Sequence, residues 1–299
     1  MEVDAGGRVA GRTGAGVVDG AILERFRGVA RGHDRWIGEC RVAVNVPPIG
    51  QEWHRIRRVR ASERSKRGQE ASCYGPSVKL SVVIPALDEA SQIGATIASA
   101  AAEGVEILVV DGGSDDGTPD RAREAGATVI ETFPGRARQL GIGAETARGD
   151  VILLLHADTR LPDGWDDAVR RAVSDPRVVG GAFSFRFAES APSLRLIEWG
   201  VRLRQALFAL PYGDQALFMR RSVLEEIGGV PQVPIMEDLD LVRALKARGR
   251  LVLLRPAAVT SSRRYRENGT FRTALRNGLA AVAWALGLER ERVAAWYRR

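Results

Sequence analysis

Blocks of apolar residues recur between residues 79 and 155, with polar and often acidic segments between them. Uninterrupted apolar runs of this kind are typical of strands that a parallel sheet buries on both faces. We predict strands at residues 80–85 (ended by Pro85), 105–110, 127–131 and 151–155. We predict helices between them at residues 90–103 (stopped by Gly104), 118–126 and 136–148. This alternation favours right-handed βαβ units and a parallel sheet.

The pattern is looser after Pro162. We predict strands at residues 178–187 and 216–220, and helices at residues 194–210 and 236–249. The second helix has an acidic first turn, which suits the positive end of its dipole. Residues 271–288 are apolar with interspersed arginines, and we expect them to pack on the sheet or to lie on a lipid surface.

The first 77 residues are rich in Gly and Arg and have no clear apolar period. We predict a poorly ordered basic extension at residues 1–77, followed by one domain at residues 78–299. We predict that this domain has two halves, residues 78–160 and residues 161–299.

Charge and composition exclude several classes of protein. The net charge is +7, but residues 1–78 hold 14 basic and 9 acidic residues, which leaves only +2 for the remainder. This distribution gives little support to nucleic-acid binding by the main domain. The two cysteines, Cys40 and Cys73, fit a reducing compartment, and neither a membrane-spanning run nor a secretory h-region is present in the sequence. We therefore expect a cytoplasmic protein.

His156-Ala157-Asp158 follows the most apolar predicted strand. Ligands of open α/β sheets bind at the carboxyl ends of the strands, and a carboxylate oxygen there suits Mg²⁺ or Mn²⁺ that carries a phosphate. Asp158 would equally serve as a turn-forming residue or as the cap of a following helix, so both interpretations stay open.

Six segments occur in an order that resembles a known family: VVIPALDE, VVDGGSDDGT, GRARQLGIGA, LLLHADT, YGDQALFMRR and MEDLDL. The chain resembles family-2 inverting glycosyltransferases of the GT-A fold, from Lys79 onward. It is most similar to a bacterial branch in which a His-Ala-Asp sequence replaces the DxD metal motif. The resemblance implies an α/β fold with a Rossmann-like, mostly parallel sheet flanked by helices.

The resemblance also implies a donor site. Pro85, Glu89 and Asp111 would lie beside the nucleotide, and Arg136 would meet the base or a phosphate. Each has a simpler interpretation, because Pro85 can end a strand and Asp111 can form a turn. Asp158 would bind a divalent metal, Mn²⁺ or Mg²⁺, that bridges the diphosphate. His156 would be a weak second ligand or a phosphate contact.

The acceptor side is implied by later motifs. Asp238, with Glu237, would be the general base for the acceptor hydroxyl, although acids in a first helical turn also stabilise the helix. Further candidates for the acceptor side are Gly213, Asp214 and Gln215. Further candidates for contacts to the diphosphate are Arg263 and Arg264. A tight turn explains Gly213–Gln215 equally well.

Other enzyme classes fit poorly. A Rossmann dehydrogenase needs GxGxxG after its first strand, and a P-loop kinase needs GxxxxGK, and neither motif is present in the sequence. We predict an inverting hexosyltransferase that uses a nucleotide-diphosphate sugar and a divalent metal, with an acceptor hydroxyl or carboxyl, plausibly on a lipid or isoprenoid-type molecule at the inner face of the membrane. The alternative is a non-catalytic sugar-nucleotide-binding protein with a decayed site.

Overall fold

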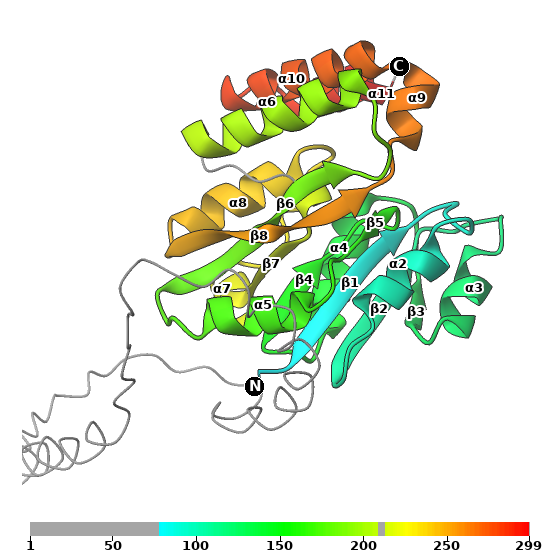
Figure 1. The fold of residues 1–299 in the computed structure, drawn as a ribbon, viewed down its shortest axis with the longest axis vertical. Helices are drawn as coiled ribbons and strands as arrows, with labels where there is room; N and C mark the ends of the chain where they lie inside the picture. The colour runs from blue at the N-terminus through cyan, green and yellow to red at the C-terminus, as the bar shows by residue number, and fades with distance from the viewer. Residues whose placement is uncertain (1–77, 209–212, 299) are drawn as a thin grey trace, which may run out of the picture. The chain divides into compact units, whose positions relative to one another are not determined.

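The computed structural model describes residues 78–208 and 213–298, which belong to one unit of the chain. The predictions for residues 1–77 lie outside the described residues. Within the described part, an eight-stranded sheet runs through the molecule with helices on both faces (Figure 1). The predicted α/β class is therefore confirmed.

The strands have the spatial order β3-β2-β1-β4-β7-β6-β8-β5. Their bounds are β1 Leu80–Ala86, β2 Val105–Asp111, β3 Thr128–Glu131, β4 Val151–Leu154, β5 Thr159–Arg160, β6 Val178–Phe187, β7 Leu217–Arg220 and β8 Arg250–Thr260. β1 to β4 are parallel, as the βαβ pattern predicts. β7 is antiparallel to both β4 and β6, and β5 is antiparallel to β8, so the sheet is parallel only in part.

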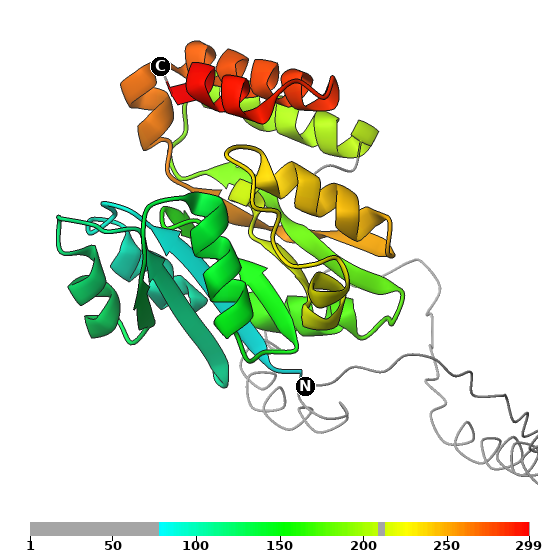
Figure 2. The same ribbon diagram turned by 180° about the vertical axis from the view of Figure 1, so that it is seen from behind.

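Three helices cover each face of the sheet (Figures 1 and 2). On one face lie α2 Ile93–Ala100, α3 Thr118–Glu124 and α5 Trp165–Val173, whose buried residues share a hydrophobic cluster with alternate side chains of β1. On the other lie α4 Arg136–Thr146, α7 Arg221–Glu226 and α8 Glu237–Lys246. The strands between them are buried on both faces, which is why they read as continuous apolar runs.

A further group of helices lies on the side of the molecule where β6 and β8 run, away from β3 (Figure 1). It comprises α6 Pro192–Phe208, α9 Arg263–Asn268, α10 Thr270–Ala285 and α11 Arg290–Arg298. Leu194 of α6 packs on Phe185 and Phe187 of β6, and Tyr265 of α9 stacks edge-on against Phe187. The predicted apolar region at residues 271–288 is thus mainly a helix that packs on other helices.

Two predicted boundaries were wrong. β1 continues past Pro85 to Ala86. The amide of Leu155 donates to Val83 O, so this side of Val83 faces β4. The missing N–H of Pro85 faces the same side of β1, but β4 ends at Leu154 and does not reach the level of Pro85. Helix α2 ends at Ala100 because Ala101 is extended, and Gly104 (φ +70°) lies in the turn before β2 instead.

β8 was not predicted at all. Its sequence is interrupted by Arg255 and Pro256, which breaks the apolar pattern. The pairing with β6 shifts at this point, from Leu254 opposite Phe183 to Ala257 opposite Ser184, so the two interrupting residues are accommodated as an irregularity in a strand near the sheet edge.

Candidate functional site

The carboxyl end of β4 meets the starts of α4 and α8 and the 3₁₀ turn Gly213–Gln215 at one edge of the sheet. Arg136, His156, Gly213, Glu237 and Asp238 line a common cavity there. Its volume is only about 10 Å³, and its other lining residues are apolar: Leu140, Leu154, Leu155, Leu217, Val230 and Leu241. The structure therefore brings together predicted donor-side and acceptor-side residues from distant parts of the sequence.

Arg136 lies at the centre of this cluster. It is the first residue of α4, and its Nε lies 3.0 Å from Glu237 Oε1 while its Nη2 lies 2.5 Å from His156 Nε2. Burial lowers the pKa of the guanidinium, but Glu237, Asp238 and the nearby Asp214 and Asp158 outweigh this effect and raise it overall. A cation surrounded by acids in this way is held in place before any ligand binds.

His156 is neutral in this setting. Burial lowers its pKa well below the ordinary value, and the positive charges of Arg136 and Arg264 lower it further. Since a guanidinium only donates, Nε2 of the imidazole accepts from Arg136 and the ring proton is on Nδ1. Arg136 occupies Nε2 of His156, the nitrogen that would bind a metal. The arrangement therefore favours a contact between His156 and a phosphate over metal binding.

Asp238 and Glu237 start α8, directly after Met236 in a left-handed conformation (φ +63°). Asp238 Oδ2 accepts the backbone N–H of Gly213 at 2.8 Å, and Oδ1 accepts that of Leu239 at 2.9 Å. Glu237 is buried, and this burial raises its pKa against the opposing charge of Arg136. Asp238 is thus oriented from both sides, which a general base requires.

The three residues of the Gly213–Gln215 turn lie in different environments. A Cβ on Gly213 would lie 2.3 Å from Arg136 Nη2 and 3.3 Å from Asp238 Oδ2, so the missing side chain permits the close approach. Burial raises the pKa of Asp214 to about 6, and its Oδ1 has no hydrogen-bond partner among the residues that the structure describes. Gln215 is turned into the sheet, where its amide donates to Phe183 O, so it supports the fold rather than the cavity.

Glu89 and Arg263 form a bidentate ion pair that the sequence did not predict. Arg263 Nη2 lies 2.7 Å from both carboxylate oxygens of Glu89, and it links α9 to the loop after β1. Burial raises the pKa of Glu89, and the charge of Asp158 adds to this, while Arg263 opposes it. Two predicted residues thus pair with each other beside the predicted metal ligand.

Asp111 is buried at the end of β2 and holds its own loop together. Its Oδ2 accepts the backbone N–H groups of Gly113 and Ser114 at 2.9 and 2.8 Å, and its Oδ1 accepts the Ser114 hydroxyl at 2.6 Å. This is the turn-forming arrangement that the sequence left open. A role in base binding stays a prediction.

Asp158 is the residue predicted to bind a metal, and this role stays a prediction. No group of three or more His, Cys, Asp or Glu side chains is placed to hold a metal ion among the residues with a described position. Asp158 does not belong to such a group, but a single carboxylate together with substrate phosphates is a common way to hold Mg²⁺. The donor set at Asp158 therefore fits a metal that arrives with a diphosphate.

Sequence reasoning missed Tyr265 and Arg204, which interact electrostatically with Asp214. Burial and then the charge of Asp214 raise the pKa of Tyr265 to about 12, and the Arg204 guanidinium lowers that of Asp214. Both residues come from the outer helices, α9 and α6, where no motif marks them.

None of the helices in the described ranges is sufficiently long and apolar to cross a bilayer.

Comparison with known proteins concerns the family and the fold of the chain. Residues 81–228 match the family described as glycosyl transferase family 2. A glucosyl-3-phosphoglycerate synthase of Mycolicibacterium paratuberculosis is 36% identical over 96 residues, which are 28% of this chain and 29% of that relative, so the match spans less than a third of the relative's length.

Structures of the glucosyl-3-phosphoglycerate synthase from Mycobacterium tuberculosis share the fold. One contains phosphoglyceric acid and is 22% identical, and another contains Mn²⁺, UDP-glucose and phosphoglyceric acid and is 20% identical. Both have a TM-score of 0.50 and cover 71% of this chain and 81% of their own. Residues 81–228, just under half of the chain, are therefore similar to glycosyl transferase family 2, and the described part of the chain has the fold of the GT-A glycosyltransferases.

Proposed function

We propose that this protein transfers a hexose from a nucleotide-diphosphate sugar to an acceptor hydroxyl or carboxyl, with inversion at the anomeric carbon. The observation that carries the proposal is the Asp238 carboxylate, which two backbone N–H groups orient at the sheet edge where Asp158 follows β4. UDP-glucose with Mn²⁺, present in one of the similar structures, is the donor that we propose to test first.

The residues have distinct parts in the proposed reaction. Asp238 accepts the acceptor proton as the acceptor oxygen forms its bond to the anomeric carbon from the face opposite the diphosphate, whose bond to that carbon breaks. Arg136 and Arg263 exchange their carboxylate partners for phosphate oxygens. Asp158, as the last residue of a His-Ala-Asp variant of the metal motif, would hold the divalent metal, which stabilises the charge on the leaving nucleotide.

The acceptor could be small or lipid-linked. Similar structures contain phosphoglyceric acid or glycerol 3-phosphate, and both are small phosphorylated molecules. For this chain we propose a lipid or isoprenoid-type acceptor, because the outer helices beside Tyr265 and Arg204 are apolar and basic. Parallel assays with phosphoglycerate and a polyprenyl phosphate distinguish the two.

Nucleotide binding and turnover test the proposal together. UDP at about 100 times its dissociation constant should stabilise the full-length chain by about 2.7 kcal/mol in thermal unfolding. We expect Mn²⁺ to be required, and Asp158→Ala to abolish the shift. Asp238→Asn should keep the shift and lose about 10²–10⁴ in transfer rate.

The decayed-site alternative is favoured by His156, which stands where relatives have an acid and whose Nε2 is occupied by Arg136. Gly112 and Gly141, where relatives often have Asp and Asn, also favour it. It predicts UDP binding without transfer to any acceptor. Transfer that survives Asp238→Asn unchanged would refute the proposed general base.

A further inference from the structure

Helix α10 turns an apolar stripe away from the molecule. Phe271, Leu275, Leu279, Val282 and Leu286 are each between 48% and 71% exposed, at spacings of three and four residues. This spacing places them on one helical face. The opposite face holds the buried residues Thr273 and Ala280, so the stripe is directed outward by the packing of the helix itself.

Helix α6, which contacts α10, repeats this arrangement. Leu196, Trp199 and Leu203 are exposed, whereas Leu194 is buried against β6. Of the 13 large hydrophobic side chains that are exposed in the described residues, 10 lie on α6, α10, α11 or the α10–α11 connection. Such concentration on one part of a molecule marks an interaction surface.

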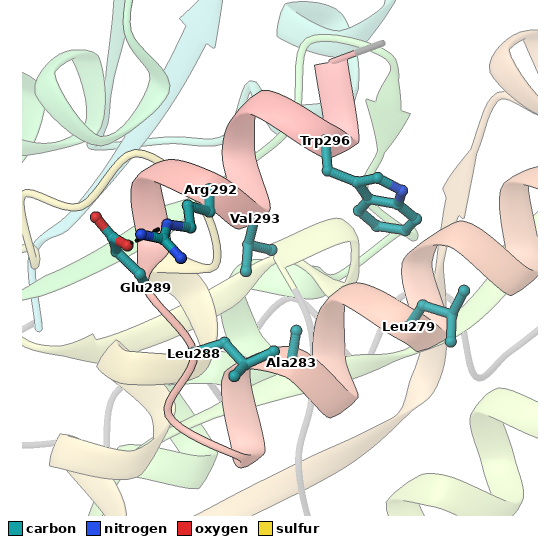
Figure 3. A pocket seen from close by; sticks show the side chains of 7 residues that line it. All are labelled: Leu279, Ala283, Leu288, Glu289, Arg292, Val293 and Trp296. Carbon is teal, nitrogen blue, oxygen red and sulfur yellow. Dashed lines mark ion pairs between the residues drawn. The ribbon is translucent and has the colours of Figure 1, made fainter.

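An apolar hollow continues the stripe between α10 and α11 (Figure 3). It has a volume of about 440 Å³, and Leu279, Ala283 and Leu288 face Val293 and Trp296 across it. Arginine lies at the rim, where Arg292 pairs with Glu289 at 2.5 Å. Indole rings beside arginines are typical of proteins that lie at a membrane–water interface.

The charge of these helices is opposite to that of the rest of the domain. We define the helical layer as residues 192–208 and 261–298, which hold 11 arginines and 4 glutamates, a net charge of +7. The remainder, residues 79–191 and 209–260, holds 18 basic and 24 acidic residues, a net charge of −6. The exposed apolar surface therefore coincides with the basic part of a domain that is otherwise acidic.

We propose that the helical layer binds the surface of an anionic lipid bilayer, an inference that goes beyond the proposed transfer reaction and does not depend on it. Basic residues near such a surface attract it, and the apolar stripes can enter the headgroup region. A second copy of the chain is a poorer occupant, since two faces of charge +7 would repel each other. Arg263 joins this layer to Glu89 in the site, so docking would bring the site close to lipid-linked acceptors.

Vesicle co-sedimentation of the full-length chain tests this surface. We expect binding to phosphatidylcholine vesicles that contain 30% phosphatidylglycerol, none to pure phosphatidylcholine, and at least about tenfold weaker binding when salt is raised from 50 to 500 mM. The double substitution Leu279→Glu with Leu286→Glu should weaken binding at least about tenfold. Leu253→Glu is the matched control, because Leu253 on β8 is 48% exposed, as is Leu279, but lies outside the layer.

All variants contain residues 1–77, so a basic contribution from that segment is constant across the series. Circular dichroism and thermal unfolding identify any variant that is not folded, and for such a variant Trp296→Ala replaces the double substitution. Loss of vesicle binding in the layer variants and not in Leu253→Glu supports the proposal. Absent binding at low salt, or equal binding by the layer variants and the wild type, overturns it. A dimer in light scattering that the same substitutions dissociate also overturns it, in favour of a second copy.

Discussion

The buried carboxyl of Asp214 predicts how stability depends on pH. Desolvation raises its pKa to about 6 from an ordinary value of 3.8, so the folded chain retains this proton to higher pH than the unfolded chain. The contribution to stability is fully present below the unfolded pKa and is lost as the pH rises through the folded one. At about 1.36 kcal/mol for each unit of pKa shift, ionisation of Asp214 costs the folded state about 3 kcal/mol at neutral pH.

Asp214→Asn removes this titration and preserves the shape of the side chain. The free energy of unfolding of the variant, relative to the wild type, should rise by about 1.4 kcal/mol between about pH 5 and about pH 7.5. Urea unfolding of the full-length chain measures it, with constant m as the check that the transition is unchanged. Asp163→Asn removes an exposed carboxyl and controls for the loss of one charge. If the free energies of unfolding of Asp214→Asn and of the wild type depend on pH in the same way, burial does not raise the pKa of Asp214 and the reasoning fails.

Three other substitutions test the close packing at Gly213, the guanidinium group of Arg136 and the packing of the sheet at Gly181. Gly213→Ala would place a Cβ against Arg136 Nη2 and Asp238 Oδ2, so we expect the transfer rate to fall about 10²-fold with little change in the urea midpoint. Arg136→Lys keeps the charge but loses the guanidinium fork, and UDP affinity by calorimetry should fall about tenfold. Gly181→Ala would bring a Cβ within 2.2 Å of Val252 O in β8, and the free energy of unfolding should drop by about 1–3 kcal/mol. Unchanged kinetics, affinity or urea midpoint, respectively, would contradict each prediction.

Local sequence predicted the first half of the sheet well because its signals are local. The apolar runs at residues 80–85, 105–110 and 151–155 correspond to β1, β2 and β4 within a residue at each end. Their parallel pairing also follows, since a helix lies between successive strands. The antiparallel insertion of β7 and the pairing of β8 with β6 depend on contacts between distant segments, which no periodicity encodes.

Candidate residues were easier to find than their partners. Strand ends and an acidic helix start pointed to Asp158 and Asp238, and the structure places both at the same sheet edge. The pairing of Glu89 with Arg263 joins residues 174 positions apart, so the sequence marked each residue but not the contact. Gln215 shows the opposite failure, because a motif position turned out to donate its amide to a strand carbonyl.

The balance of charge in the proposed site predicts that a metal and a diphosphate bind cooperatively. The electrostatically connected groups are five carboxylates and four arginines: Glu89, Asp158, Asp214, Glu237 and Asp238, with Arg136, Arg204, Arg263 and Arg264. A diphosphate that takes Arg136 and Arg263 from their partners leaves Glu237 and Glu89 uncompensated, in a place where burial already raises the pKa of both. A divalent cation at Asp158 restores the lost positive charge. Each ligand should therefore raise the affinity of the other by the same factor, which calorimetric titration of UDP with and without Mn²⁺, and of Mn²⁺ with and without UDP, would measure. Affinities that are independent of each other would mean that the arginines do not leave their carboxylates when the nucleotide binds.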